Sequence, residues 1–183
     1  SRSKKNKPQT LPVMLKTIAR ELAAHHNEKG IIHTHSYQLG IEIYDYFSKT
    51  VHGSRLLFPK CADDRDGAMN RHRMSPEPTV LISPSMTEGF DFKDDLARWQ
   101  IIAKMPYPYL GDRQVAAMKD RNPDWYAMQT ATTVIQACGR IVRDEKDHGV
   151  TYMLDGDFNM LWSRYSHFFP PWFKAAMVWP GKK

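Results

Sequence analysis

The feature that most constrains the fold of this 183-residue chain is an alternation of short apolar runs with segments of helical periodicity. Runs such as "TVLIS" and "VTYML" are largely apolar, without polar alternation, as strands buried on both faces are. Between them, Leu11, Leu15, Ile18 and Leu22 recur at the spacing of one helical face. This alternation predicts an α/β domain with a mostly parallel sheet flanked by helices.

The same pattern places the individual elements. We expect strands within residues 31–36, 54–60, 79–83, 98–108 and 148–157, and helices within residues 11–30, 39–50 and 110–147, the last broken near Pro123. Residues 61–78 are polar and punctuated by prolines, so we predict a loop with at most one helical turn there. The basic residues 1–10 are expected to be a tail or linker remnant, which leaves residues 11–183 as one domain.

Composition narrows the class of protein. Hydrophobic residues make up 42% of the chain and charged residues 25%, which indicates a globular fold. The sequence has no apolar run of about twenty residues, so we expect no membrane span. Cys61 and Cys138 are too few for a disulfide framework, which favours a reducing, intracellular setting. The net charge of +6 weakly favours a polyanionic partner.

One short segment, "QACGRIVR", carries an unusual set of donors. Gln136 and Arg140 are four residues apart, and Arg140 and Arg143 are three apart, so all three would share a face of a helix. Two forked, permanently charged guanidinium groups suit a phosphate ligand. A solvated helix face with surface ion pairs would give the same local pattern, so the segment alone does not decide between them.

A polar loop follows one of the predicted buried strands. In "TVLISPSMTEGFDF", the residues Thr87, Glu88, Gly89 and Asp91 come directly after the strand. Ligands of parallel sheets bind beyond the carboxyl ends of strands. A hydroxyl, two carboxylates and a permissive glycine there suit a nucleotide edge or a strand phosphate, although a capped turn is the simpler alternative.

Taken together, these segments resemble the second motor domain of superfamily 2 helicases of the XPD/DinG-like group. "GIIHTHSYQLGIEIYDYF" is similar to the group's motif IV, "SPSMTEGFDFKDDLARWQIIAKMPYPY" to motif V, and "QACGRIVRDEKDHGVTYMLD" to motif VI. The three segments follow the family order across residues 30–155. The resemblance implies a RecA-like, P-loop-NTPase-type three-layer sandwich.

The resemblance also implies roles for particular residues. In the family, ATP lies between two motor domains, and motif VI of the second domain supplies arginine fingers to the γ-phosphate. By match these are Arg140 and Arg143, with Gln136 nearby on the nucleotide. The remaining matched residues fall into two groups, those expected to couple ATP to strand movement (Glu88, Gly89 and Asp91) and those expected to contact the nucleic-acid backbone (Ser36, Tyr37 and Thr87).

Two positions depart from the group's pattern. The family often has an aromatic residue where this chain has Thr87, and it commonly has an arginine where this chain has Asp157. These departures affect the local DNA or nucleotide contacts that the resemblance would otherwise assign.

The sequence lacks the parts that a motor needs to hold a nucleotide by itself. It contains no "GxxxxGK[ST]" phosphate loop. Asp155 closes an apolar strand as a Mg²⁺ ligand would, but without that loop a structural role is expected for it. We therefore expect ATP and Mg²⁺ to be bound mainly by an N-terminal motor domain of the same polypeptide, and the chain alone to be inactive. An iron–sulphur cluster occurs in many family members, but two isolated cysteines here cannot build one.

Two other groups of residues have competing interpretations. His33 and His35 are two apart on a predicted strand and could face one metal ion, but no carboxylate or cysteine completes a set, so we predict no metal site. The aromatic residues of the closing segment suit either base stacking or packing, and packing is the preferred prediction; they are Phe168, Phe169, Trp172, Phe173 and Trp179.

The expected partners are single-stranded or forked DNA and the other motor domain of the same polypeptide. The choice of DNA and a 5′-to-3′ direction of movement along the strand follow only from the resemblance. One alternative is a non-catalytic nucleic-acid-binding or scaffold module with a RecA-like fold. Another is a different superfamily 2 motor, such as an RNA helicase or a restriction-type translocase. The Glu-Gly-x-Asp-Phe form of the motif V segment favours the XPD/DinG-like group over the second alternative.

Overall fold

A computed structural model of the chain describes residues 7–85, 94–142 and 147–179. The chain divides into two compact units. Unit 1 comprises Ser1–Lys104 and Arg140–Asp155, and unit 2 comprises Met105–Gly139 and Gly156–Lys183.

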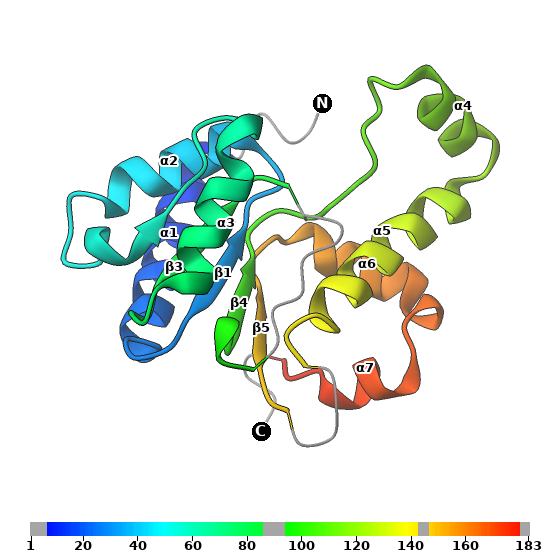
Figure 1. The fold of residues 1–183 in the computed structure, drawn as a ribbon. Coiled ribbons are helices and arrows are strands. Elements are labelled where there is room, and N and C mark those ends of the chain that lie inside the picture. Colours follow the sequence, from blue (N-terminus) through cyan, green and yellow to red (C-terminus); the bar gives the residue numbers. More distant parts are fainter. Residues whose placement is uncertain (1–6, 86–93, 143–146, 180–183) are drawn as a thin grey trace. The chain divides into compact units, whose positions relative to one another are not determined.

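Unit 1 is built on a parallel five-stranded sheet (Figure 1). Its strands are β1 (Gly30–His33), β2 (Leu56–Leu57), β3 (Val80–Ser83), β4 (Trp99–Ile102) and β5 (Val150–Met153), in the order β2-β3-β1-β4-β5. All four neighbouring pairs are parallel, and in the central strand Gly30 pairs with Val80 on one side and Trp99 on the other. The predicted parallel α/β fold is confirmed.

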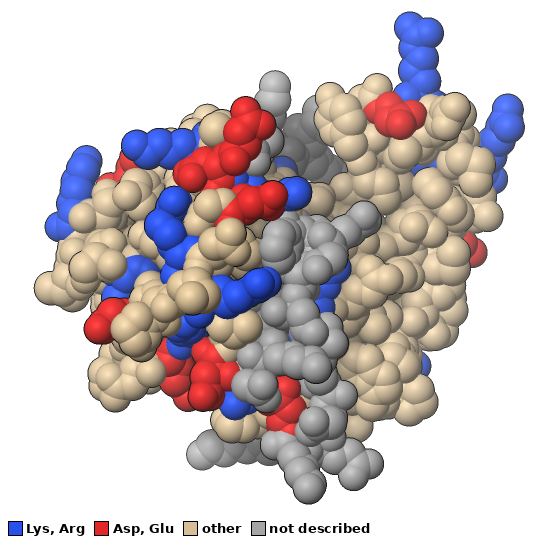
Figure 2. All heavy atoms as spheres, in the orientation of Figure 1, with Lys and Arg blue, Asp and Glu red and all other residues tan. Residues whose placement is uncertain are grey.

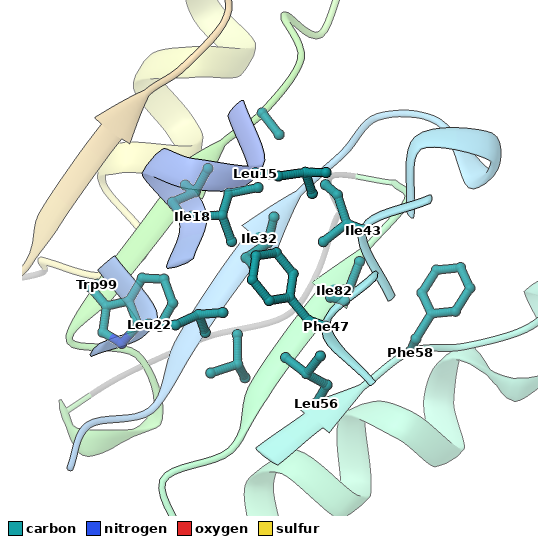
Figure 3. Close-up of a cluster of buried hydrophobic side chains, with 13 residues drawn as sticks. Leu15, Ile18, Leu22, Ile32, Ile43, Phe47, Leu56, Phe58, Ile82 and Trp99 are labelled. Atoms are coloured by element: carbon teal, nitrogen blue, oxygen red, sulfur yellow. The ribbon is translucent and has the colours of Figure 1, made fainter. Parts of the chain in front are cut away.

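Helices α1 (Lys7–Ala24) and α2 (Tyr37–Phe47) cover one face of this sheet. Figure 3 shows their apolar side chains meeting those of the strands. The labelled members of this cluster are Leu15, Ile18, Leu22, Ile32, Ile43, Phe47, Leu56, Phe58, Ile82 and Trp99. Helix α1 begins four residues before the predicted start at residue 11, so the end of the predicted tail is helical. The domain boundary itself remains a prediction.

Helix α3 (Arg65–Met74) packs against the opposite face, which completes three layers. Its Ala68 and Met69 join a second apolar cluster with Ile31 and Leu81, whose side chains alternate with those of the first face. The prediction of a loop over residues 61–78 was therefore wrong. Its polar composition hid a helix whose third buried residue is a histidine, His72.

His72 is buried because both of its ring nitrogens have partners. Its Nδ1 lies 2.8 Å from Thr79 Oγ1, and its Nε2 lies 2.8 Å from the carbonyl oxygen of Leu96. Burial lowers the pKa of His72 to about 4, although the bond to Leu96 opposes this shift. The ring is therefore neutral at physiological pH and serves as a core residue.

Two further residues fix the packing of unit 1. Gly30 lies against the fully buried Trp99, and a Cβ atom at Gly30 would be 2.1 Å from the indole Cε2. Arg55, just before β2, donates hydrogen bonds to four carbonyl oxygens that lie around the end of α1 and before β3; these belong to Leu22, His25, Glu28 and Pro78. Its planar fork therefore satisfies carbonyl groups that the helix end leaves unpaired.

Unit 2 is helical in the part that the structure describes, with α4 (Arg113–Arg121), α5 (Pro123–Cys138), α6 (Asp157–Tyr165) and α7 (Pro171–Ala176). The predicted break near Pro123 is confirmed, because Asn122 ends α4 and its side chain caps α5 by accepting from Trp125 N–H at 3.0 Å.

The aromatic closing segment forms the core of unit 2. Phe169 and Phe173 are buried and lie against Trp162, with ring centroids 5.2 and 6.3 Å away. Packing is therefore the role of these two residues, whereas Trp172 is 54% exposed. In neither unit is a described helix long and apolar enough to cross a bilayer.

Candidate nucleotide and nucleic-acid site

The carboxyl ends of the parallel strands lie at one edge of the sheet, where the sequence placed its candidate residues. Thr34 and Ser83 follow or end two neighbouring strands and are both buried. The Thr34 hydroxyl donates to the carbonyl oxygens of Ser36 at 2.9 Å and Ser83 at 3.3 Å. These bonds hold the turn after β1 against the end of β3, so the edge has a fixed backbone.

Ser36 and Tyr37 occupy the junction between β1 and α2. Ser36 is the N-cap of α2, and its hydroxyl accepts from Leu39 N–H at 3.4 Å. Tyr37 is the first helical residue and is 37% exposed. His35, immediately before them, has φ 46°, which is uncommon for a residue with a side chain. Such strained backbone is concentrated at functional sites.

The motif VI segment differs from its prediction. Helix α5 ends at Cys138, and Gly139 is its C-cap, with its N–H donating to Ile135 O at 2.9 Å. Gln136 is exposed in the last turn of the helix, whereas Arg140 lies beyond the helix in a turn and is half-buried. The prediction of one shared helical face was therefore wrong for this pair, because the helix stops at the glycine. Arg143 lies outside the described residues.

The chain is anchored on the sheet directly after Arg140. Ile141 is buried and belongs to the apolar cluster of Ile31 and Leu81. Ile31 and His33 lie two residues apart on β1 and therefore share a face of the sheet. The arginine is thus attached to a residue that packs close to the carboxyl end of the central strand.

His33, at the end of β1, has a perturbed pKa. Burial lowers the pKa of its imidazole to about 4, the hydrogen bond to Gln100 opposes the shift, and the positive charge of Arg140 adds to it. The position of Ile141 agrees with this charge effect, since Ile141 packs with Ile31, two residues before His33 on β1.

The sequence did not reveal a hydrogen-bonded chain across three strands. His33 on β1 lies 3.0 Å from Gln100 Oε1 on β4, and Gln100 Nε2 donates to Thr151 Oγ1 on β5 at 2.9 Å. The partners are separated by 67 and 51 residues. The sequence offered one signal for these hydrogen bonds. The alternation of side chains along each strand predicts which residues share a face of the sheet.

The motif V candidates, which are Thr87, Glu88, Gly89 and Asp91, lie outside the described residues. Ser83 and Ser85, just before that segment, are joined by a hydrogen bond from the Ser83 hydroxyl to the Ser85 carbonyl oxygen. Within the described ranges, no group of three or more His, Cys, Asp or Glu side chains is placed to hold a metal ion.

Figure 2 shows one face of each unit. Lys and Arg side chains are intermixed with Asp and Glu over the region of α3 in unit 1, and much of the surface around α5 and α6 in unit 2 is uncharged. On the face of unit 1 that is shown, the described basic side chains therefore do not form a single basic patch.

The chain is similar in sequence to known helicases. The family model described as "Helicase C-terminal domain" matches residues 19–176. Regulator of telomere elongation helicase 1 homologs are 31% identical over 87 residues in Aedes aegypti and 30% identical over 108 residues in Caenorhabditis elegans. These matches cover 40% and 50% of this chain but only 9% and 11% of those proteins. The chain therefore spans a small part of the curated relatives that it matches.

A solved structure shares the fold. The C-terminal domain of Saccharomyces cerevisiae Dbp5, in a complex with Gle1 and IP6, superimposes with a TM-score of 0.56. The superposition covers 90% of this chain and 88% of that one at 14% sequence identity. At this identity the likeness concerns the fold alone.

Proposed function

Because the chain belongs to the helicase C-terminal domain family, we propose that it is the second motor domain of an ATP-dependent DNA helicase. In this proposal it completes an ATP site that another motor domain of the same polypeptide begins. The observation that carries the proposal is the place of Arg140 in the fold, directly before Ile141, which is buried in the cluster that contains Ile31 of the central strand.

Arg140 would act as an arginine finger. A guanidinium at the sheet edge is permanently charged, and its fork can donate two parallel hydrogen bonds to the oxygens of a transferring phosphoryl group. In other NTPases such a residue raises the rate by about 10³- to 10⁵-fold, which corresponds to roughly 4 to 7 kcal/mol of barrier. Arg143 is proposed as the second finger, and Gln136 as a residue near the nucleotide.

The remaining candidates would link the nucleotide to the strand. Glu88, Gly89 and Asp91 are proposed to couple ATP to strand movement, and Thr87 to contact the nucleic-acid backbone. Ser36 and Tyr37 are proposed to contact the same backbone, because they begin a helix that follows a strand at the ligand-binding edge. DNA as the strand and 5′-to-3′ polarity are proposed from the family resemblance.

ATP and Mg²⁺ would be held mainly by the other motor domain, since the sequence of this chain has no phosphate loop. The side chains of this chain would then contribute charge to the γ-phosphate and contacts to the strand. On this basis the 183-residue chain by itself would not hydrolyse ATP.

The test is single-turnover ATP cleavage with single-stranded DNA, using the helicase that carries this domain. We expect Arg140→Ala and Arg143→Ala to slow cleavage by about 10³-fold or more, because the developing negative charge loses its partner. Arg121→Ala is the matched control, since Arg121 ends α4 and is exposed, and it should cleave at the wild-type rate. Wild-type cleavage by both finger variants would refute the proposal and favour the non-catalytic scaffold.

A further inference from the structure

His33 ends the central strand of unit 1 and is only 3% exposed. Its imidazole is the first member of the hydrogen-bonded chain that runs through Gln100 to Thr151. These hydrogen bonds join side chains of β1, β4 and β5, so they hold the His33 ring in one orientation relative to three strands of the sheet. A side chain fixed in this way at the ligand-binding edge requires a physical explanation.

The bonding pattern determines the state of the ring. The Gln100 amide donates from its Nε2 to Thr151, which leaves its Oε1, an acceptor, facing the histidine. His33 Nε2 must therefore carry the proton, and Nδ1 is left with a lone pair. Nδ1 is buried, and no hydrogen-bond partner for it exists in the described part of the chain. A buried acceptor without a donor is unfavourable by about 1–3 kcal/mol.

The proposed finger residue directly precedes a residue that packs on the same face of the sheet as His33. Ile141 packs in the cluster of Ile31, which is two residues before His33 on the same face of the sheet. Arg140 directly precedes Ile141, and its positive charge adds to the burial that lowers the pKa of His33. A guanidinium carries five N–H donors, so it can donate one bond to an imidazole and still present two donors to a phosphate.

We infer that His33 is a positioning residue for Arg140, whose guanidinium donates a hydrogen bond to His33 Nδ1 when the ATP site is complete. Gln100 and Thr151 hold the ring so that its lone pair faces that donor. The bond would fix the side chain of Arg140 in the orientation that reaches the phosphate. This inference rests on the proposed finger role of Arg140.

The chemistry of the pair explains why the ring is kept neutral. A protonated imidazole would repel the guanidinium and would have no lone pair to offer. Burial at the end of β1 disfavours the charged form, so the acceptor is present throughout the physiological range. Phenylalanine would fill the same space without an acceptor, and lysine would add a second positive charge.

Two substitutions separate the functions of the two ring nitrogens. In His33→Gln the amide reaches the position of Nε2 and keeps the link to Gln100, but it has no acceptor at the position of Nδ1. In His33→Asn the amide lies near the position of Nδ1 and loses the link. Steady-state ATP hydrolysis by the helicase that carries this domain should show about a tenfold lower kcat for the glutamine variant, at unchanged KM for ATP. The asparagine variant should lose less.

A double-mutant cycle tests whether His33 acts through Arg140. His33→Gln should have no further effect on kcat when Arg140 is already alanine, since there is then no guanidinium to position. His72→Gln is the matched control, because His72 is also buried and neutral but both of its nitrogens have partners within the core. It should lower the thermal midpoint, leave kcat within about twofold, and combine additively with Arg140→Ala.

The outcomes are distinct. Equal kcat losses for the two His33 variants, a wild-type kcat for His33→Gln, or additivity of His33→Gln with Arg140→Ala would each overturn the inference. Wild-type turnover by Arg140→Ala would instead refute the proposed function, and with it the premise of the inference. A tenfold kcat loss for His33→Gln that disappears in the alanine background would support it.

Discussion

Replacing Gly30 by alanine tests the packing at the amino end of the central strand. A Cβ atom there would lie 2.1 Å from Cε2 of Trp99 and 2.5 Å from both Cδ2 and Cζ2. Carbon atoms in contact are normally about 3.5–4.0 Å apart. The indole cannot easily move away, since it is fully buried and stacks on His25 with ring centroids 5.2 Å apart. Either the strand or the ring must therefore move.

The size of the effect follows from this crowding. Adding carbon to a filled core lowers the free energy of unfolding by about 1–3 kcal/mol. Gly30→Ala should lie at the upper end, about 3 kcal/mol, because the clash involves three ring atoms of a residue without free space. For a chain of this length each kcal/mol shifts the thermal midpoint by about 2–4 °C, so we expect a decrease of about 6–12 °C.

The assay is urea unfolding followed by circular dichroism, with two comparisons. Gly139→Ala is the matched control, because its Cβ would lie 3.5 Å from the nearest atom, Ile135 O, and should change the free energy by less than about 0.5 kcal/mol. Trp99→Phe removes ring atoms that clash, so Gly30→Ala should be much less destabilising in that background.

Two results would refute this reasoning about Gly30. One is a loss below about 0.5 kcal/mol for Gly30→Ala in the otherwise wild-type chain, which would place the variant in the range of ordinary surface substitutions. The other is an equal loss in the Trp99→Phe background, which would mean that the indole is not the cause.

Two further predictions concern stability. The pKa values of His33 and His72 are lowered to about 4 in the folded chain, so the unfolded chain binds more protons and stability should fall as pH decreases from about 6.5 to 4. Complete protonation of each histidine would lower the free energy of unfolding by about 3 kcal/mol. Urea midpoints measured across this pH range should therefore fall less steeply for His72→Gln than for the wild-type chain, and an equally steep fall would contradict the lowered pKa of His72. Arg55→Lys should lower the free energy of unfolding by about 2 kcal/mol, because an ammonium cannot reach all four carbonyl oxygens, and an unchanged urea midpoint would contradict this role.

The sheet was predictable because its strands are continuous apolar runs. Their parallel arrangement follows from the helical segments between them, which act as crossovers. Helix α3 was not predictable in the same way. Its sequence, "RDGAMNRHRM", has a weak apolar stripe, and one buried position is His72, whose burial depends on Thr79 and Leu96. From sequence alone a histidine is expected to be exposed, because the hydrogen-bond partners that allow its burial are not known.

The local structure around Arg140 was predicted incorrectly. The sequence analysis placed Arg140 inside a helix, on one face with Gln136 and Arg143, because the spacing rule was applied across Gly139, where the helix ends. Glycine is a frequent helix terminator, and that signal was available in the sequence. The link from His33 to Gln100 was not available, because the pairing of two strands 67 residues apart is set by their register, which one sequence does not specify.

Strand β1 has hydrogen-bonded neighbours on both sides, β3 and β4, over its whole length. A slip of one residue would break both ladders and turn His33 to the opposite face of the sheet. Its backbone amides should accordingly be among the slowest in the molecule to exchange with deuterium. In the motor that we propose, a movement of the groups at the end of β1 would therefore displace the entire sheet as one body, rather than slide the strand within it.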